Sequence, residues 1–310
     1  MNQRSLMNSK GVQLALLTAL ISGIAVFANS FAVKAFKDPF VFTTLKNVLV
    51  ALALTGLFSA GLLRHQLKAL TRRQWLQLGL IGLVGGSTPF LLFFKGISQM
   101  PTPVMAAFIH KTLFIWVALL ALPLLKEKLN KIQWLALAVL LLGTYSLGSP
   151  KAWHWGTGEW LVLSATWLWA AETILAKRIL RNLPVQVVAW GRMALGSVFL
   201  LAFLAVTGRI SGLFELSARQ WSWSLVSLVF LTGYVLTWFH ALKRAPAAVV
   251  ASVLVLAAPI TALLTSLLVT HRISNQDMIG VSVIAIAISL LISQRPKQFN
   301  MSVNPVKTDE

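Results

Sequence analysis

The stretch LLFFKGISQMPTPVMAAF at residues 91–108 decides the fold, because a second stretch with a similar pattern follows later in the chain. Residues 236–253, LTWFHALKRAPAAVVASV, align with it without a gap at an offset of 145, which places Pro101 over Pro246. Each copy ends one apolar segment, turns near the proline and begins the next. About 20 apolar residues in a helix span the hydrocarbon core of a bilayer. The stretch therefore predicts two consecutive membrane-spanning segments in each half of a repeated chain.

Similar offsets extend the repeat in both directions. The further matches are EKLNKIQWLALAVLLLG (127–143) with HRISNQDMIGVSVIAIA (271–287) after one residue is dropped, NSFAVK (29–34) with ETILAK (172–177), Pro39 with Pro184, and Lys46 with Arg192 to within one residue. Each half contains five spans, and because five is odd the second copy crosses the membrane in the opposite orientation. We expect one repeat in residues 1–149 and the other in residues 150–294. The polar segment 295–310 predicts a disordered cytoplasmic tail.

The composition places nearly the whole chain in a membrane. The 310 residues are 57% hydrophobic and only 11% charged, and the mean hydropathy is +0.77. Backbone groups in lipid must be hydrogen-bonded within the protein, and the apolar segments are too long for barrel strands, so we predict an all-α integral membrane protein. The ten expected transmembrane helices are residues 11–33, 40–63, 75–96, 102–125, 132–149, 158–176, 185–207, 220–241, 247–270 and 276–294.

The positive charge is distributed as a topology signal. The net charge is +19, but the Lys and Arg residues form short clusters between apolar segments, which argues against a nucleic-acid partner. With ten spans, 17 of these residues lie on the side of both termini and 6 on the other. This bias predicts cytoplasmic termini in the inner (plasma) membrane. We interpret the first apolar run as a retained helix. The chain has no cysteine, which excludes disulfides and thiolate metal sites.

These features together resemble a known family. The ten spans, the inverted repeat, and the pattern Lys126-Glu127-Lys128-Leu129, a short turn, Gln133-Trp134 and an apolar span with Gly143 are similar to the EamA-type branch of the drug/metabolite transporter superfamily. The resemblance covers residues 11–293. It implies that spans one to four and six to nine enclose the transport pathway. Spans five and ten would support the periphery or form a homodimer contact.

The chain departs from the family pattern at two places. Such proteins often have a proline midway along spans four and nine; Pro259 is present in the ninth, but Phe114 takes that place in the fourth. They also often repeat the Glu after both spans, whereas His271 stands opposite Glu127. We therefore expect an asymmetric mechanism.

Lys111 and His110 lie deep in the fourth span. A charge at such a depth costs about 2.5–3.5 kcal/mol on insertion scales, so it is retained for a partner or a function. For Lys111 we weigh an anion-binding role in a central cavity against a structural pair with Glu172 or a carbonyl. For His110, an uncharged side chain bonded to a neighbouring helix is favoured over a substrate or proton role.

Glu172 is the one acidic residue deep in a predicted span. It either couples proton movement to transport or forms a fixed salt bridge, and the sequence leaves both open. Trp167 and Trp169 lie within about one helical turn of it, so one of them is expected to line the cavity. Lys46 and Arg192 occupy matching repeat positions and are weighed as substrate contacts against helix-end or gating contacts.

Two prolines, Pro89 and Pro259, interrupt predicted helices and are candidate hinges beside the binding site. No metal site or cofactor is expected, because the five histidines are scattered. The same scatter, with the lack of a paired carboxylate or activated nucleophile, argues against an enzyme.

The predicted function is secondary transport of a small organic metabolite by alternating access, with export favoured over import. Lys46, Lys111 and Arg192 against Glu172 leave a net positive interior, which favours an amino-acid-like zwitterion or an organic anion. The alternatives are a multidrug or cation exporter and a lipid-phosphate flippase of the same fold.

Overall fold

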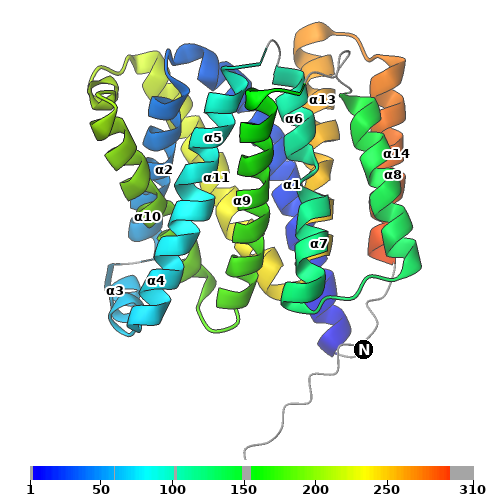
Figure 1. Cartoon of the computed structure of the whole chain (residues 1–310), viewed down its shortest axis with the longest axis horizontal. Coiled ribbons are helices and arrows are strands. Elements are labelled where there is room, and N and C mark those ends of the chain that lie inside the picture. Colours follow the sequence, from blue (N-terminus) through cyan, green and yellow to red (C-terminus); the bar gives the residue numbers. More distant parts are fainter. Residues whose placement is uncertain (1–2, 59, 101–102, 149–154, 294–310) are drawn as a thin grey trace, which may run out of the picture.

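The computed structural model describes residues 3–58, 60–100, 103–148 and 155–293, and the regular structure in these ranges is entirely helical (Figure 1). The predicted disordered tail at 295–310 lies outside these ranges. In chain order the ten spans are α1 (Gln3–Ala35); α2 (Pro39–Leu57); α4 (Arg72–Ile81), η1 (Gly82–Ser87) and α5 (Thr88–Ile97); α6 (Pro103–Lys111) and α7 (Leu113–Leu125); α8 (Lys131–Leu147); α9 (Thr157–Ile179); α10 (Val185–Val206); α11 (Ala218–Arg244); α12 (Ala247–Val253), η3 (Leu254–Leu256), α13 (Ala257–Thr265) and η4 (Ser266–Thr270); and α14 (Asn275–Ser293).

Length and hydropathy support a membrane-spanning bundle. Eight of these described spans are long and apolar enough to cross a bilayer; α8 is a shorter apolar helix of 17 residues. The remaining span, α9, has 23 residues and includes Glu159 and Glu172. The all-α, ten-span prediction is therefore confirmed.

The second span is shorter than predicted. The sequence pattern suggested residues 40–63, whereas α2 ends at Leu57 and a separate helix, α3 (Ala60–Lys68), follows. Residues 60–63 belong to α3 together with Arg64, His65 and Lys68, so they form the start of a short polar helix and do not extend the apolar span. A further 3-10 turn, η2 (Ile210–Leu213), links α10 to α11.

The helix contacts follow the inverted repeat. Helix α2 packs on α10, α7 on α12, and α8 on α14, and each of these pairs joins equivalent spans of the two halves. Helix α1 (span one) packs along α11 (span eight). The matching pair from the other halves, α9 (span six) and η1–α5 (span three), packs in the same way. In Figure 1, α8 and α14 lie at one edge of the bundle, away from the centre. A two-fold relation between the halves accounts for all of these contacts.

Spans four and nine are interrupted at the same repeat position. Span four breaks at Thr112, whose hydroxyl donates to the Ile109 carbonyl at 2.6 Å. Span nine changes from an α-helix to the 3-10 turn η3 just before Pro259. Both spans also end in a left-handed residue, Lys126 with φ 56° and His271 with φ 51°. The break in span four therefore forms without the proline that the family pattern contains.

The interruption of span three is not repeated in span eight. The π-helical segment η1 interrupts it at Gly82–Ser87, whereas α11 in the other half is continuous over 27 residues. Most of the buried apolar side chains form one cluster that joins both halves.

Candidate functional site

The carbonyl groups of η1 are the centre of a buried polar cluster. Proline has no amide hydrogen, so Pro89 cannot donate the helical hydrogen bond to Gly85 four residues earlier. Two side chains donate to the Gly85 carbonyl instead: Arg192 Nη2 at 3.0 Å and Trp169 Nε1 at 3.2 Å. Asn47 Nδ2 donates to the next carbonyl, that of Gly86, at 3.3 Å. One irregular turn thus connects α2, α9 and α10.

The glycines of η1 allow these helices to approach. A Cβ on Gly85 would lie 2.7 Å from Cδ of Glu172 and closer still to its Cγ. A Cβ on Gly86 would lie 2.5 Å from the Arg192 carbonyl oxygen. The Gly86 backbone also contacts Gly196 directly, because a Cβ on Gly196 would meet the Gly86 Cα at 2.9 Å. The absence of side chains here places the Glu172 carboxylate against the η1 backbone.

Glu172 of α9 and Arg192 of α10 form an ion pair inside the bundle. Arg192 Nε lies 3.3 Å from Glu172 Oε1, and the two side chains are 9% and 4% exposed. Tyr234 of α11 interacts electrostatically with both charges and stacks on Trp238. Removing one partner of such a buried pair costs about 3–5 kcal/mol, because the remaining charge is left uncompensated.

Lys46 adds a second positive charge to the cluster. It is 8% exposed, and its Nζ lies 5.1 Å from the ring centre of Phe42 and 5.4 Å from that of Phe90. Its charge also acts on Arg192 across the α2–α10 contact. The ion pairs among the described residues are Arg192–Glu172 and Arg209–Asp38, so Lys46 has no carboxylate partner there. The cluster therefore carries an excess positive charge.

Aromatic rings enclose the cluster on the α9 side. The Trp169 indole is 9% exposed and contacts Phe90 at 5.2 Å, Phe93 at 5.7 Å and His110 at 4.7 Å between ring centres. His110 Nδ1 is buried and has no hydrogen-bond partner among the described residues. Trp167, in contrast, is 43% exposed and packs on Trp116. Of the two predicted tryptophans, Trp169 is the one beside Glu172 and Arg192.

Lys111 lies apart from the Glu172–Arg192 pair. Its Nζ is 3.5 Å from the position that a Cβ on Gly148 would occupy, at the C-terminal end of α8. The partial negative charge of a helix C-terminus stabilises a cation. Glu172 pairs with Arg192 instead, so this placement favours a structural role for Lys111 at the end of α8.

Several further buried side-chain atoms have no hydrogen-bond partner among the described residues. They are the hydroxyls of Thr43, Thr44 and Thr232 and the Oδ1 atom of Asn47. Thr43 and Asn47 lie one helical turn apart on α2 and flank Lys46. Asn47, Thr232 and Tyr234 were not among the residues predicted from the sequence. The adjacent Lys46-Asn47 pair and the GGSTP segment at 85–89 were the available signals for this site.

The end of the bundle that carries the N-terminus is held closed by side-chain contacts to backbone groups. Glu127 accepts hydrogen bonds from the amides of Ala247 at 2.6 Å and Ala248 at 3.1 Å, at the start of α12. Lys177 of α9 donates to the carbonyls of Leu242 and Ala245 at the end of α11. Burial raises the pKa of Glu127, although the two amides and the charges of Lys177 and Arg181 oppose this shift.

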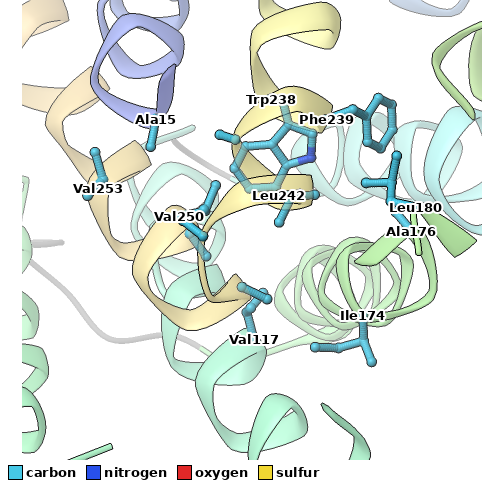
Figure 2. Close-up of a cluster of buried hydrophobic side chains, with 14 of the residues drawn as sticks. Ala15, Val117, Ile174, Ala176, Leu180, Trp238, Phe239, Leu242, Val250 and Val253 are labelled. Carbon is cyan, nitrogen blue, oxygen red and sulfur yellow. The ribbon is translucent and has the colours of Figure 1, made fainter. Parts of the chain in front are cut away.

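An apolar layer lies behind these contacts. Val117 of α7, Leu242 of α11 and Val250 of α12 lie near Trp238, and Ile174 of α9 belongs to the same buried cluster (Figure 2).

Comparison with known proteins gives the family. The model of the EamA-like transporter family matches the chain twice, over residues 9–149 and 156–293. The chain belongs to the EamA-like transporter family. The two matches to the EamA model cover nearly all of the described residues. As a family member with several candidate membrane-spanning helices, the chain is a multi-pass membrane protein.

Individual relatives add less detail. A protein of Synechocystis sp. described as "Uncharacterized transporter sll1164" is 24% identical over 196 residues, which cover 58% of this chain and 55% of that protein. The chain thus matches about half the length of that curated relative. A solved structure titled only "Crystal structure of protein" superposes with a TM-score of 0.74 at 18% identity and covers 91% of this chain and 96% of the other. This similarity shows the fold alone.

Proposed function

We propose that this EamA-family protein exports a small organic solute with a negatively charged group, either an organic anion or an amino-acid-like zwitterion. The observation that carries the proposal is the buried cluster of Lys46 and Arg192 around a single carboxylate, that of Glu172. Two cations and one anion leave room for one further negative charge. A lipophilic cation would be repelled by this excess charge.

The solute's anionic group would bind between Lys46 and Arg192. Arg192 presents its Nη2 to the Gly85 carbonyl and its Nε to Glu172, so its position is fixed from two sides. Asn47, Thr43 and Thr232 supply neutral donors and acceptors for the rest of a small polar solute. The adjacent rings of Phe90 and Trp169 would cover the apolar part of the solute.

Glu172 gives this site a means of coupling to protons. The carboxylate competes with an incoming anionic group for Arg192, and taking up a proton would release Arg192 to the solute. We propose that solute and proton exchange at this ion pair, and that the cycle runs outward with both termini on the cytoplasmic side of the plasma membrane.

Alternating access would then require the contacts of Glu127 and Lys177 to break. These contacts join α9, α11, α12 and the α7–α8 turn at the end that carries the N-terminus. The breaks at Thr112 and η3 lie within the two spans that would bend, at equivalent repeat positions. Pro89 and Pro259 lie beside such breaks and stay candidate hinges.

The test begins with ligand-induced stabilisation of the purified protein by a panel of organic anions, zwitterions and quaternary ammonium compounds. A ligand that binds the folded state raises the apparent stability as ln(1 + [L]/Kd). The stabilising compounds are then followed in proteoliposomes by counterflow. We expect uptake of anions or zwitterions, loss of uptake in Lys46→Met, and nearly full uptake in Lys111→Met.

The last expectation reverses the order that the sequence alone suggested, in which Lys111 was favoured over Lys46. Transport restricted to quaternary ammonium compounds would overturn the proposed charge selectivity. Equal uptake by the wild type and Lys46→Met would remove Lys46 from the binding site.

A further inference from the structure

A hollow lies on the outside of the bundle, where α10 contributes Trp190, two residues before Arg192. It has a volume of about 450 Å³ and opens between α2, α3, α4 and α10. Its lining combines Leu63 and Leu67, the indoles of Trp75 and Trp190, and the side chains of Arg64 and Lys68. These chemical types are those of a membrane interface, where aromatic rings and basic groups meet the lipid headgroups.

The aromatic wall of the hollow is held in place. Trp190 Nε1 donates to Thr55 Oγ1 at 3.0 Å, which joins α10 to α2. The Trp75 ring meets Trp190 edge-on, at 6.3 Å between ring centres and an interplanar angle of 78°. Trp75 remains 37% exposed, so one indole stays available to a ligand.

The basic wall is supplied by the short helix α3. Arg64 and Lys68 are four residues apart and therefore lie on one face of this helix, and both are exposed. Leu63 beside them is buried, so α3 rests on the bundle through an apolar side. The lining contains no acidic side chain, and the described residues place no carboxylate within ion-pair distance of either cation.

The position of α3 places this hollow at the membrane surface. Nine residues in a helix rise about 13 Å, which is too short to span a bilayer. The helix follows α2 directly and lies at the same end of the bundle as the N-terminus (Figure 1). This end carries most of the basic loops, as a surface that faces anionic lipid does.

We propose that this hollow binds an anionic phospholipid. The lipid phosphate would bind between Arg64 and Lys68, and the glycerol and first acyl carbons would pack on Trp75 and Leu67. Arginine matches the geometry of a phosphate group through two parallel N–H donors. The apolar and aromatic wall selects a lipid over a soluble phosphate, because only the lipid brings an acyl chain to that wall.

The experiment uses the full chain in a neutral detergent, with added phosphatidylglycerol, phosphatidylcholine or inorganic phosphate. The readouts are the apparent melting temperature and lipid adducts counted by native mass spectrometry. Each basic residue near a membrane surface contributes about 1 kcal/mol to binding of anionic lipid, so we expect Arg64→Gln with Lys68→Gln to weaken phosphatidylglycerol binding about 30-fold.

The matched control is Arg72→Gln with Arg73→Gln. Both arginines are exposed and lie at the start of the neighbouring helix α4, but neither lines the hollow. This variant removes the same charge from the same end of the bundle, and we expect it to bind phosphatidylglycerol like the wild type. Trp75→Ala, which removes only the apolar wall, should weaken adducts of both lipids, and it keeps the test decisive should the Arg64 and Lys68 variant fail to fold.

Three results would overturn the proposal. The first is equal stabilisation by phosphatidylglycerol and phosphatidylcholine. The second is the same loss of phosphatidylglycerol binding in the control variant, which would indicate a diffuse charge effect. The third is full stabilisation by inorganic phosphate, which would assign the hollow to a soluble anion.

Discussion

Replacing Gly85 by alanine tests the polar cluster at its tightest point. The new methyl group would lie 2.7 Å from Cδ of Glu172, whereas carbon atoms in contact are normally about 3.5–4.0 Å apart. Glu172 must therefore move by more than about 1 Å, because its Cγ would lie even closer to the new methyl group than Cδ. It starts only 3.3 Å from Arg192, and η1 cannot withdraw freely because Gly86 is packed on Gly196.

The cost follows from these contacts. Overpacking a tight interior site costs about 1–3 kcal/mol, and the weakened ion pair adds to this. We expect Gly85→Ala to destabilise the protein by about 2–3 kcal/mol, which corresponds to a melting temperature lower by about 4–12 °C. Transport should fall with it, because Glu172 and Arg192 no longer meet in their native geometry.

The control is Gly79→Ala in the same span. A Cβ on Gly79 would meet nothing within 4 Å, so this substitution changes a glycine to alanine without a clash. Alanine in a helix is favoured over glycine by about 1 kcal/mol, so the control should be neutral or slightly stabilised. Thermal unfolding of both variants in the same detergent provides the comparison. The reasoning fails if the two proteins unfold within a degree of each other.

Three further substitutions test other parts of the argument. Glu172→Gln should leave Arg192 unpaired and lower the free energy of unfolding by about 3–5 kcal/mol. It should also abolish pH-driven uptake while substrate exchange continues. Unchanged pH dependence of uptake in proteoliposomes would exclude the proton role of Glu172. Pro89→Ala restores an amide donor for the Gly85 carbonyl, so it should compete with Arg192 and Trp169 and lower transport with little loss of thermal stability; wild-type transport would contradict a functional role for η1. Glu127→Ala removes a cap worth about 1 kcal/mol from the start of α12, so a cysteine introduced at the buried Ala248 should react with maleimide about fivefold faster than in the same background with Glu127 intact. The chain has no native cysteine to interfere, and Glu159→Ala, which removes a similar cap from the Gly156 amide at the opposite end, should leave that rate unchanged.

The fold could be predicted well from the sequence because its determinants are local or periodic. Apolar length defines the spans, and the matched prolines at 101 and 246 define the repeat. The repeat also explains features that were not predicted, such as the capping motifs TRRQW at 71–75 and SARQW at 217–221. In each motif the Ser or Thr hydroxyl accepts a hydrogen bond from the backbone amide of the Gln three residues later. The Gln side chain in turn accepts one from the backbone amide of that Ser or Thr.

The site was only partly predictable, because it depends on contacts between distant segments. Glu172, Arg192 and Lys46 were identified as deep charges, but which of them meet depends on how α2, α9 and α10 pack around η1. Lys111 looked most important because it is a charge near the middle of the fourth span, whereas the second repeat has Leu256 at the matching position. The sequence could not show that its flexible side chain reaches the end of α8. The free Gly85 carbonyl follows from Pro89, yet its two donors come from other helices.

The presence of η1 in only one half bears on the resting state of the transporter. Two perfectly matched inverted repeats could exchange conformations and give inward-facing and outward-facing states of equal free energy. Here the interruption that connects α2, α9 and α10 has no equivalent in the continuous helix α11. Exchanging the two halves would therefore not reproduce the same set of contacts. In the proposed alternating-access cycle the two end states would therefore differ in free energy, and an imbalance of about 1.4 kcal/mol already populates one of them ten times more than the other. Under the proposed function, the protein would wait for its solute predominantly on one side of the membrane.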